Sequence, residues 1–176
     1  MKRLLIFLFI FLFITGCNKN NKPSNEVEKM FLNYNNLKSE VLIQLDSVFE
    51  IEDLTETQKD KYKTILKKQY EDLKYTILDE DVDTDNAVVS VEIEVYNLNK
   101  AIEDSEKYLE EHKDEFYINN KLDKEKFWNY KLDHMSNMDE RTKYILEITL
   151  TKINNKWHID DLLESDRKKI HGLYKN

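Results

Sequence analysis

The spacing of apolar positions along the chain changes several times, and each change predicts a new element. From Val27 onward the apolar positions recur every three or four residues, which is the period of a helix with one buried face. This face consists of Val27, Met30, Phe31, Tyr34, Leu37, Val41, Leu45 and Val48. Asn25 is the expected N-cap of this first helix, with Glu28 completing a capping box. A second helix should begin at the capping-box pattern Thr55–Gln58 and bury a stripe that includes Tyr62 and Leu66.

Alternating apolar and polar residues, the period of a half-buried strand, occur in four segments. These segments are Leu73–Ile77, Val89–Val95, Tyr144–Leu150 and Trp157–Ile159. Asp83–Asn86 supply the turn between the first two segments, and Asn154-Asn155 supply the turn between the last two. The pattern therefore predicts two antiparallel hairpins that are well separated along the chain.

Helical spacing returns between the hairpins and after the second one. It covers Leu98–His112 and, beyond a loop around Tyr117–Lys121, a helix that Asp123 should cap. A short last helix should open at Ser165-Asp166, with Gly172 at the position that follows a helix end. The order helix, helix, hairpin, helix, helix, hairpin, short helix predicts an α+β domain. In this fold one antiparallel sheet of about four strands packs against helices.

The first residues form a unit of another kind. Lys2-Arg3 precede an unbroken apolar run, Leu4–Ile14, which is shorter than the ~20 residues that a membrane-spanning helix needs. Small residues follow this run and lead to Cys17, the only cysteine in the chain. A basic start, a short apolar core and small residues before a cleavage point are typical of a secretory signal. A lone cysteine also cannot form an internal disulfide.

The segment Ile14-Thr15-Gly16-Cys17 resembles the lipobox of bacterial lipoproteins. In that family a lipid is attached to the cysteine thiol, the signal peptide is cut before the cysteine, and the new N-terminus is often acylated, for example with palmitate. The resemblance implies a cleaved lipoprotein signal peptide at 1–16 and lipid attachment at Cys17. The alternative is an ordinary cleaved signal with an incidental cysteine.

Lipid attachment would place the protein on the extracytoplasmic face of the cell membrane. Residues 17–25 would form the acylated cysteine and a polar tether, and residues 26–176 a single α+β domain. Asn18 after the cysteine resembles an outer-membrane sorting signal, which would apply if the bacterium has two membranes. The membrane, reached through the acyl chains, is thus the first expected partner.

The composition narrows the class of partner further. The net charge is −8, and removal of the signal peptide would leave 25 basic and 35 acidic side chains, a net charge of −10. Such an acidic surface repels phosphate backbones, so we expect no nucleic-acid binding. After processing, Gly172 would be the only glycine, which excludes a glycine-rich phosphate loop.

Aspartates at alternating positions in Asp79–Asn86 are the best candidate for a metal site. Asp81, Asp83 and Asp85 occupy positions 1, 3 and 5 of an EF-hand-type calcium loop, and Glu92 occupies position 12. That loop needs a helix on each side, whereas alternating segments flank this one. We interpret it as a solvated turn, with weak cation binding or a calcium loop as the alternatives.

Residue patterns typical of catalysis are scarce. The histidines, His112, His134, His158 and His171, lack the spacing of a zinc pair, and no G-x-S-x-G nucleophile motif occurs. The acidic pairs Glu110-Glu111 and Asp160-Asp161 are typical of exposed charge. The sequence therefore predicts no catalytic, cofactor-binding or metal-ligating residue.

The C-terminal part carries a second resemblance. Lys156-Trp157, Asp160-Asp161-Leu162 and the ending Lys169–Tyr174 match a K-W-x-x-D-D-L segment and a K-I-H-G-x-Y ending. A group of bacterial surface lipoproteins of uncharacterised function, most from low-GC Gram-positive and related anaerobic bacteria, shares these segments. The resemblance covers most of residues 26–176 and implies a fold similar to NTF2-like or cystatin-like domains. It implies no catalytic residue.

The expected function is a lipid-anchored extracytoplasmic domain that binds a small molecule, a peptide or an envelope protein. One alternative is an enzyme with an NTF2-like pocket, an isomerase or a hydrolase, which would need a buried carboxylate or histidine. Another is a structural or adhesion module of the cell envelope. A polar cavity would favour ligand binding or catalysis, whereas a solid core would favour the envelope module.

Overall fold

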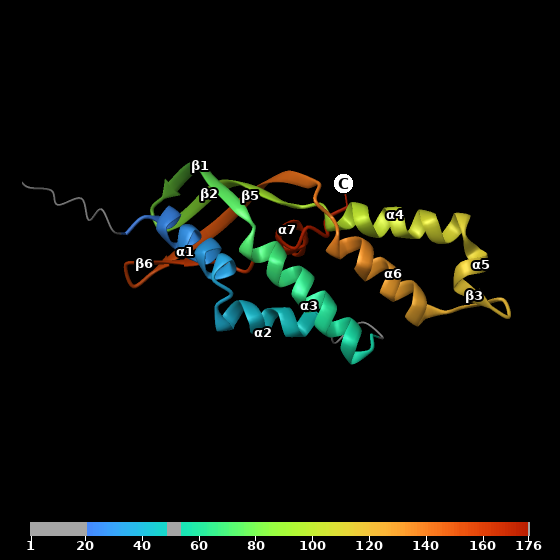
Figure 1. The fold of residues 1–176 in the computed structure, drawn as a ribbon. Coiled ribbons are helices and arrows are strands. Elements are labelled where there is room, and N and C mark those ends of the chain that lie inside the picture. The colour runs from blue at the N-terminus through green and yellow to red at the C-terminus, as the bar shows by residue number, and fades with distance from the viewer. Residues whose placement is uncertain (1–20, 49–53, 176) are drawn as a thin grey trace, which may run out of the picture.

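The computed structural model describes residues 21–48 and 54–175 (Figure 1). The helices are α1 (Pro23–Asn35), α2 (Ser39–Val48), α3 (Glu56–Glu71), α4 (Leu98–Glu111), α5 (Lys113–Phe116), α6 (Lys124–Ser136) and α7 (Glu164–Ile170). The strands are β1 (Lys74–Asp83), β2 (Asn86–Tyr96), β3 (Tyr117–Ile118), β4 (Lys121–Leu122), β5 (Arg141–Ile153) and β6 (Lys156–Ile159). This is the expected α+β order, with the expected loop before α6 replaced by α5 and the small β3–β4 hairpin.

The two predicted hairpins form one antiparallel sheet in the order β1-β2-β5-β6. The alternation seen in the sequence decides which side of this sheet is covered. Val89, Val91 and Ile93 of β2 and Leu146 and Ile148 of β5 face inward and are buried. Helices α1 and α7 pack on this inner side (Figure 1). The opposite side carries polar residues paired across the strands, as expected for a solvated sheet face.

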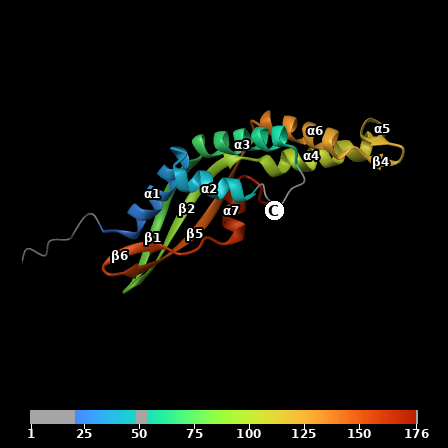
Figure 2. The same cartoon turned by 90° about the horizontal axis from the view of Figure 1, so that it is seen from below.

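Helices α4 and α6 run side by side beyond the end of the sheet and form an arm, residues 98–136, with α5 and the β3–β4 hairpin at its tip (Figures 1 and 2). Aromatic rings hold the arm together. The rings of Tyr108 and Tyr130 stack at 4.8 Å, and Phe116 packs edge-on against Tyr130 at 5.4 Å. Asp123 caps α6 as expected, because its side chain accepts a hydrogen bond from the amide of Lys126.

The single helix expected over Val27–Val48 is wrong, because the chain turns between α1 and α2. Leu37 has a φ of +47°, and the amides of Leu37 and Lys38 donate to the carbonyls of Tyr34 and Asn33. These two bonds form the helix-ending motif that usually has glycine at the left-handed position. A tertiary contact also favours the end of α1 at this point. The side-chain amide of Asn35 donates a hydrogen bond to the backbone carbonyl of Leu73 at 2.9 Å.

The expected N-cap at Asn25 is also wrong, because α1 begins at Pro23 and its N-cap is Lys22, three residues earlier. Proline suits the first helical position, since it has no amide hydrogen and its φ is already helical. The amide of Ser24 donates to the Glu80 carboxylate on β1 at 2.7 Å. A carboxylate at a helix N-terminus is stabilising because it faces the positive end of the helix dipole.

Glu80 reaches α1 because β1 contains a bulge between Ile77 and Asp79. Unbroken alternation after Ile77 would turn Asp79 and Asp81 toward the core. The bulge shifts the pattern by one residue, so Asp79 and Asp81 are exposed and Glu80 lies on the α1 side. The β1–β2 hairpin can therefore carry a row of aspartates without burying a charge.

The expected turn at Asp83–Asn86 is confirmed. Asp83 pairs with Asn86, and Thr84 has a φ of +51°. Glu92, position 12 of the calcium-loop alternative, lies in the middle of β2 between Thr76 and Ile145. The segment thus has strand geometry on both sides, which is not that of an EF-hand loop. Within residues 21–48 and 54–175 no group of three or more His, Asp or Glu side chains is placed to hold a metal ion.

Candidate functional site

An open groove lies where α1, α2 and the segment from β6 to α7 meet, and its volume is about 270 Å³. This is close to the lower end of the range for small-molecule sites, about 300 to 1,000 Å³. Its apolar walls are Met30, Val41, Ile159 and Leu162. Its polar lining consists of Asn33, Tyr34, Glu40, Asp160, Asp161 and Arg167. The break between α1 and α2 creates the groove, because it brings α2 residues opposite the β6–α7 segment.

Arg167, on α7, is fixed at the groove by the backbone. Its Nε and Nη2 atoms donate to the carbonyl of Leu162 at 3.0 and 2.7 Å. Among the residues that the structure describes, no carboxylate lies within ion-pair distance, 4 Å, of this guanidinium. Arg167 therefore contributes a positive charge to the groove without a direct ion pair, although it is close enough to Glu164 to help Lys168 lower the pKa of that carboxyl group.

The carboxylates of the groove are likewise without basic partners. Glu40 on α2 and Asp161 after β6 form no ion pair with any residue in the described ranges. Asp160 accepts a hydrogen bond from the Thr151 hydroxyl at 3.0 Å. Carboxylates and a guanidinium thus line one groove while staying too far apart to pair with each other.

Tyr34 is the most buried polar residue of the groove lining, with 5% of its surface exposed. Its ring packs edge-on against Tyr70 at 5.1 Å, and its Oη accepts and donates no hydrogen bond within the described residues. Burial raises the pKa of Tyr34, while the nearby Arg167 acts in the opposite direction. The groove therefore presents a neutral hydroxyl next to a guanidinium.

The buried Tyr70 and the partly buried His171 form a pair at the C-terminal end of α7, with Oη and Nδ1 2.8 Å apart. Burial lowers the pKa of His171 to about 4, and the charge of Arg167 adds to this effect. Burial also raises the pKa of Tyr70, helped by Tyr34 and Tyr62 nearby. Both side chains are neutral at pH 7, so the Tyr70 hydroxyl can donate to His171.

Gly172 ends α7 as expected, with a φ of +71°. The amides of Gly172 and Leu173 donate to the carbonyls of Lys169 and Lys168, which closes the helix-ending motif. The Gly172 carbonyl in turn accepts from the amide of Asn99 at 2.8 Å, at the start of α4. This connection fixes the last turn of α7, and with it Arg167, against the rest of the fold.

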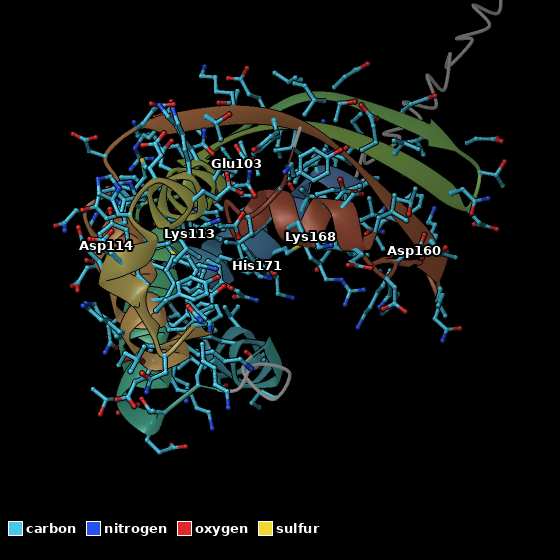
Figure 3. The ribbon with its side chains drawn as sticks, turned by 90° about the vertical axis from the view of Figure 1, so that its right-hand side faces the viewer. Glu103, Lys113, Asp114, Asp160, Lys168 and His171 are labelled. Atoms are coloured by element: carbon cyan, nitrogen blue, oxygen red, sulfur yellow. The ribbon has the colours of Figure 1, made fainter. Side chains whose placement is uncertain are left out.

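The other histidines lie apart from the groove. His112 stacks on Tyr108 at 3.9 Å in the arm, and His134 lies 3.9 Å from the carboxylate of Asp104. His158 lies on β6 opposite Thr151. Figure 3 shows Asp160 and His171 toward opposite ends of α7, and Figures 1 and 2 show α5 at the tip of the arm, away from α7. The structure therefore brings no two histidines into one site within the described ranges.

Cys17, the lipid-attachment residue expected from the sequence, lies outside the described residues, as does the signal peptide at 1–16. Within the described residues no helix is both long and apolar enough to cross a membrane.

The groove residues Tyr34, Glu40 and Arg167 have no motif that would have revealed them. The sequence identified Tyr34 only as a position on a buried helix face, and it did not single out Glu40 or Arg167.

Comparisons of this chain with protein-family models, with curated protein sequences and with solved structures give no match.

Proposed function

We propose that the protein is a lipid-anchored binding module on the extracytoplasmic face of the cell membrane, and that its ligand occupies the groove between α1, α2 and the β6–α7 segment. The observation that carries the binding part is the lining of the groove, where Glu40, Asp161 and Arg167 have no charged partner among the described residues. All three side chains are exposed to solvent, so a ligand with complementary charges can reach them and form charge-assisted hydrogen bonds with them. The anchoring part rests on the lipobox resemblance at Cys17.

The start of the described chain supports a defined orientation of this module. The Asn21 side chain donates to the Asn155 carbonyl in the β5–β6 turn at 2.7 Å. The arm extends from the opposite end of the molecule (Figure 1). Four residue steps separate Cys17 from Asn21, a reach of at most about 14 Å. An acylated Cys17 would thus hold the β5–β6 turn near the membrane and leave the arm pointing away from it.

Catalysis is the second candidate function, in keeping with the proposed similarity to NTF2-like or cystatin-like domains. An enzyme of that type would need a histidine or carboxylate buried in its cavity. His171 has the required shift of its pKa, but it is engaged with Tyr70 and is not part of the groove lining. The groove is also open to solvent, whereas an enzyme of that type would need an enclosed cavity. We therefore prefer ligand binding to catalysis, and also to a purely structural role in the envelope.

Replacement of Cys17 by alanine tests the anchor. We expect the wild-type protein in the membrane fraction and the Cys17→Ala protein either unprocessed or released from it. The physical reason is that two or three acyl chains contribute about 0.8 kcal/mol for each buried CH2 group, which suffices for stable anchoring. Cell fractionation and mass spectrometry of the N-terminus measure both outcomes. The Asn18→Ala protein is the control and should mature normally. Normal maturation and membrane partition of Cys17→Ala would contradict the anchor.

A groove-filling substitution tests the binding site. Asn33 lines the groove from α1, so Asn33→Trp should fill it, whereas Leu32→Trp places the same side chain on the exposed side of α1. We expect at least one of four probes, leucine, leucyl-leucine, uridine or glucose, to bind the wild type and Leu32→Trp. Asn33→Trp should weaken that binding at least tenfold in isothermal titration calorimetry. Binding that Asn33→Trp leaves unchanged, or no binding of any probe, would count against this groove.

A further inference from the structure

The groove is lined by a guanidinium and by carboxylates that form no ion pair with one another, and this combination suggests a class of ligand. We propose that it binds a short peptide with both termini free, with the carboxylate at Arg167 and Tyr34 and the ammonium at Glu40 and Asp161. The inference rests on the proposed function, because it names the ligand of the same groove. A ligand with one charge would satisfy only one side of the groove, whereas a zwitterion satisfies both.

The carboxylate side is defined by donors that the fold leaves unused. Arg167 uses Nε and Nη2 on the Leu162 carbonyl, and its Nη1 forms no hydrogen bond among the described residues. A guanidinium fixed in this way can donate to a carboxylate without losing further side-chain freedom. Tyr34 lines the same groove with a hydroxyl that solvent reaches, although the residue as a whole is buried, and this hydroxyl has no hydrogen-bond partner in the described part of the chain.

The ammonium side is defined by acceptors. Glu40 comes from the first turn of α2, and Asp161 follows β6, so the two carboxylates approach the groove from different elements. Neither has a basic partner within the described residues. Asp160 already accepts from Thr151, which leaves Glu40 and Asp161 as the main acceptors for an ammonium group. An ammonium group can donate three hydrogen bonds, which suits two carboxylates that line one groove.

The size and the apolar walls restrict the peptide. A groove of about 270 Å³ has room for about two residues rather than for a folded partner. Met30 and Val41 on one wall and Ile159 and Leu162 on the other favour aliphatic side chains. Leucyl-leucine is therefore the probe of choice, since it combines free termini with aliphatic side chains.

The test compares three forms of this probe by isothermal titration calorimetry of the lipidated protein in detergent. These are leucyl-leucine, its N-acetylated form and its C-terminal amide. We expect each blocked form to bind at least tenfold more weakly than the free dipeptide. With Arg167→Gln, the free dipeptide should no longer bind more tightly than its amide, but it should still bind more tightly than its N-acetylated form. With Glu40→Gln combined with Asp161→Asn, the free dipeptide should no longer bind more tightly than its N-acetylated form, but it should still bind more tightly than its amide.

Lys168→Gln is the matched control, because Lys168 lies on α7 next to Arg167, pairs with Glu164 and does not line the groove. It should leave all three affinities unchanged, and circular dichroism should confirm that every variant is folded. Equal binding of the free and blocked forms would overturn the inference. Binding of uridine or glucose in the groove without leucyl-leucine would also overturn it, but would leave the proposed binding function intact. No binding of any probe would overturn both.

Discussion

Replacement of Gly172 by alanine is expected to lower the free energy of unfolding by about 3 kcal/mol or more. A Cβ atom at this position would lie 2.2 Å from the carbonyl oxygen of Tyr96 and 2.5 Å from Nε2 of Gln69. The Tyr96 oxygen belongs to the backbone of β2 and cannot move aside without disturbing the strand. The φ of +71° adds strain, because side chains with a Cβ disfavour the left-handed region.

Urea unfolding followed by tryptophan fluorescence can measure this loss, because Trp157 is buried in the core. Asn155→Ala is the matched control, since Asn155 has a φ of +62° in the exposed β5–β6 turn. It should lose only about 1 kcal/mol, the cost of the left-handed backbone alone. If Gly172→Ala lost no more than Asn155→Ala, the close approach of α7 to β2 would be wrong.

The second large effect is a loss of stability as the pH falls from 6.5 toward 4, caused by His171. Its pKa is 6.5 in the unfolded chain and about 4 in the fold, because burial and Arg167 disfavour the charged ring. Between these values the unfolded chain binds the proton and the folded chain does not. The stabilisation is therefore complete above pH 6.5 and decreases as the pH falls toward 4. The total loss should be about 3 kcal/mol.

Urea unfolding at pH 7, 6, 5 and 4.5 measures this dependence. Carboxyl groups with lowered pKa values, such as Asp72 and Glu94, begin to lose their contribution as the pH approaches their unfolded values of 3.8 and 4.5, so the change between pH 7 and 5 reports mainly on the histidine. His171→Gln should flatten the profile, because glutamine does not titrate. His158→Gln, on the exposed part of β6, should keep the slope. A wild-type profile that is flat from pH 7 to 4.5 would contradict the buried neutral state of His171.

Local patterns in the sequence predicted many features of the fold correctly. The capping box at Thr55–Gln58 is present, because Thr55 and Gln58 exchange side-chain and backbone hydrogen bonds within one turn. The strands follow from period-two alternation, since burial on one sheet face depends on neighbouring residues in the chain. Gly172 was recognisable because a glycine after a basic helix end is a local signal.

The errors arose where a residue distant in the sequence decides the local structure. Leu37 adopts the left-handed backbone that usually requires glycine, and Asn35 beside it donates to the Leu73 carbonyl on a distant part of the chain. Glu80, from β1, takes the role expected of Asn25 at the start of α1. His171 is neutral because Tyr70 and the packing around it bury its ring. None of these partners can be located from spacing alone.

The sequence by itself determined the α+β class, the two hairpins and most helix positions, because the period of apolar residues reports directly which face of an element is buried. It also supplied the lipobox resemblance at Cys17, which remains a prediction. Only the tertiary structure decided where the groove lies and which side chains line it. Tyr34, Glu40 and Arg167 are separated along the chain and belong to three helices. Their meeting depends on the turn after α1 and on the docking of α7, which long-range packing and hydrogen bonds determine.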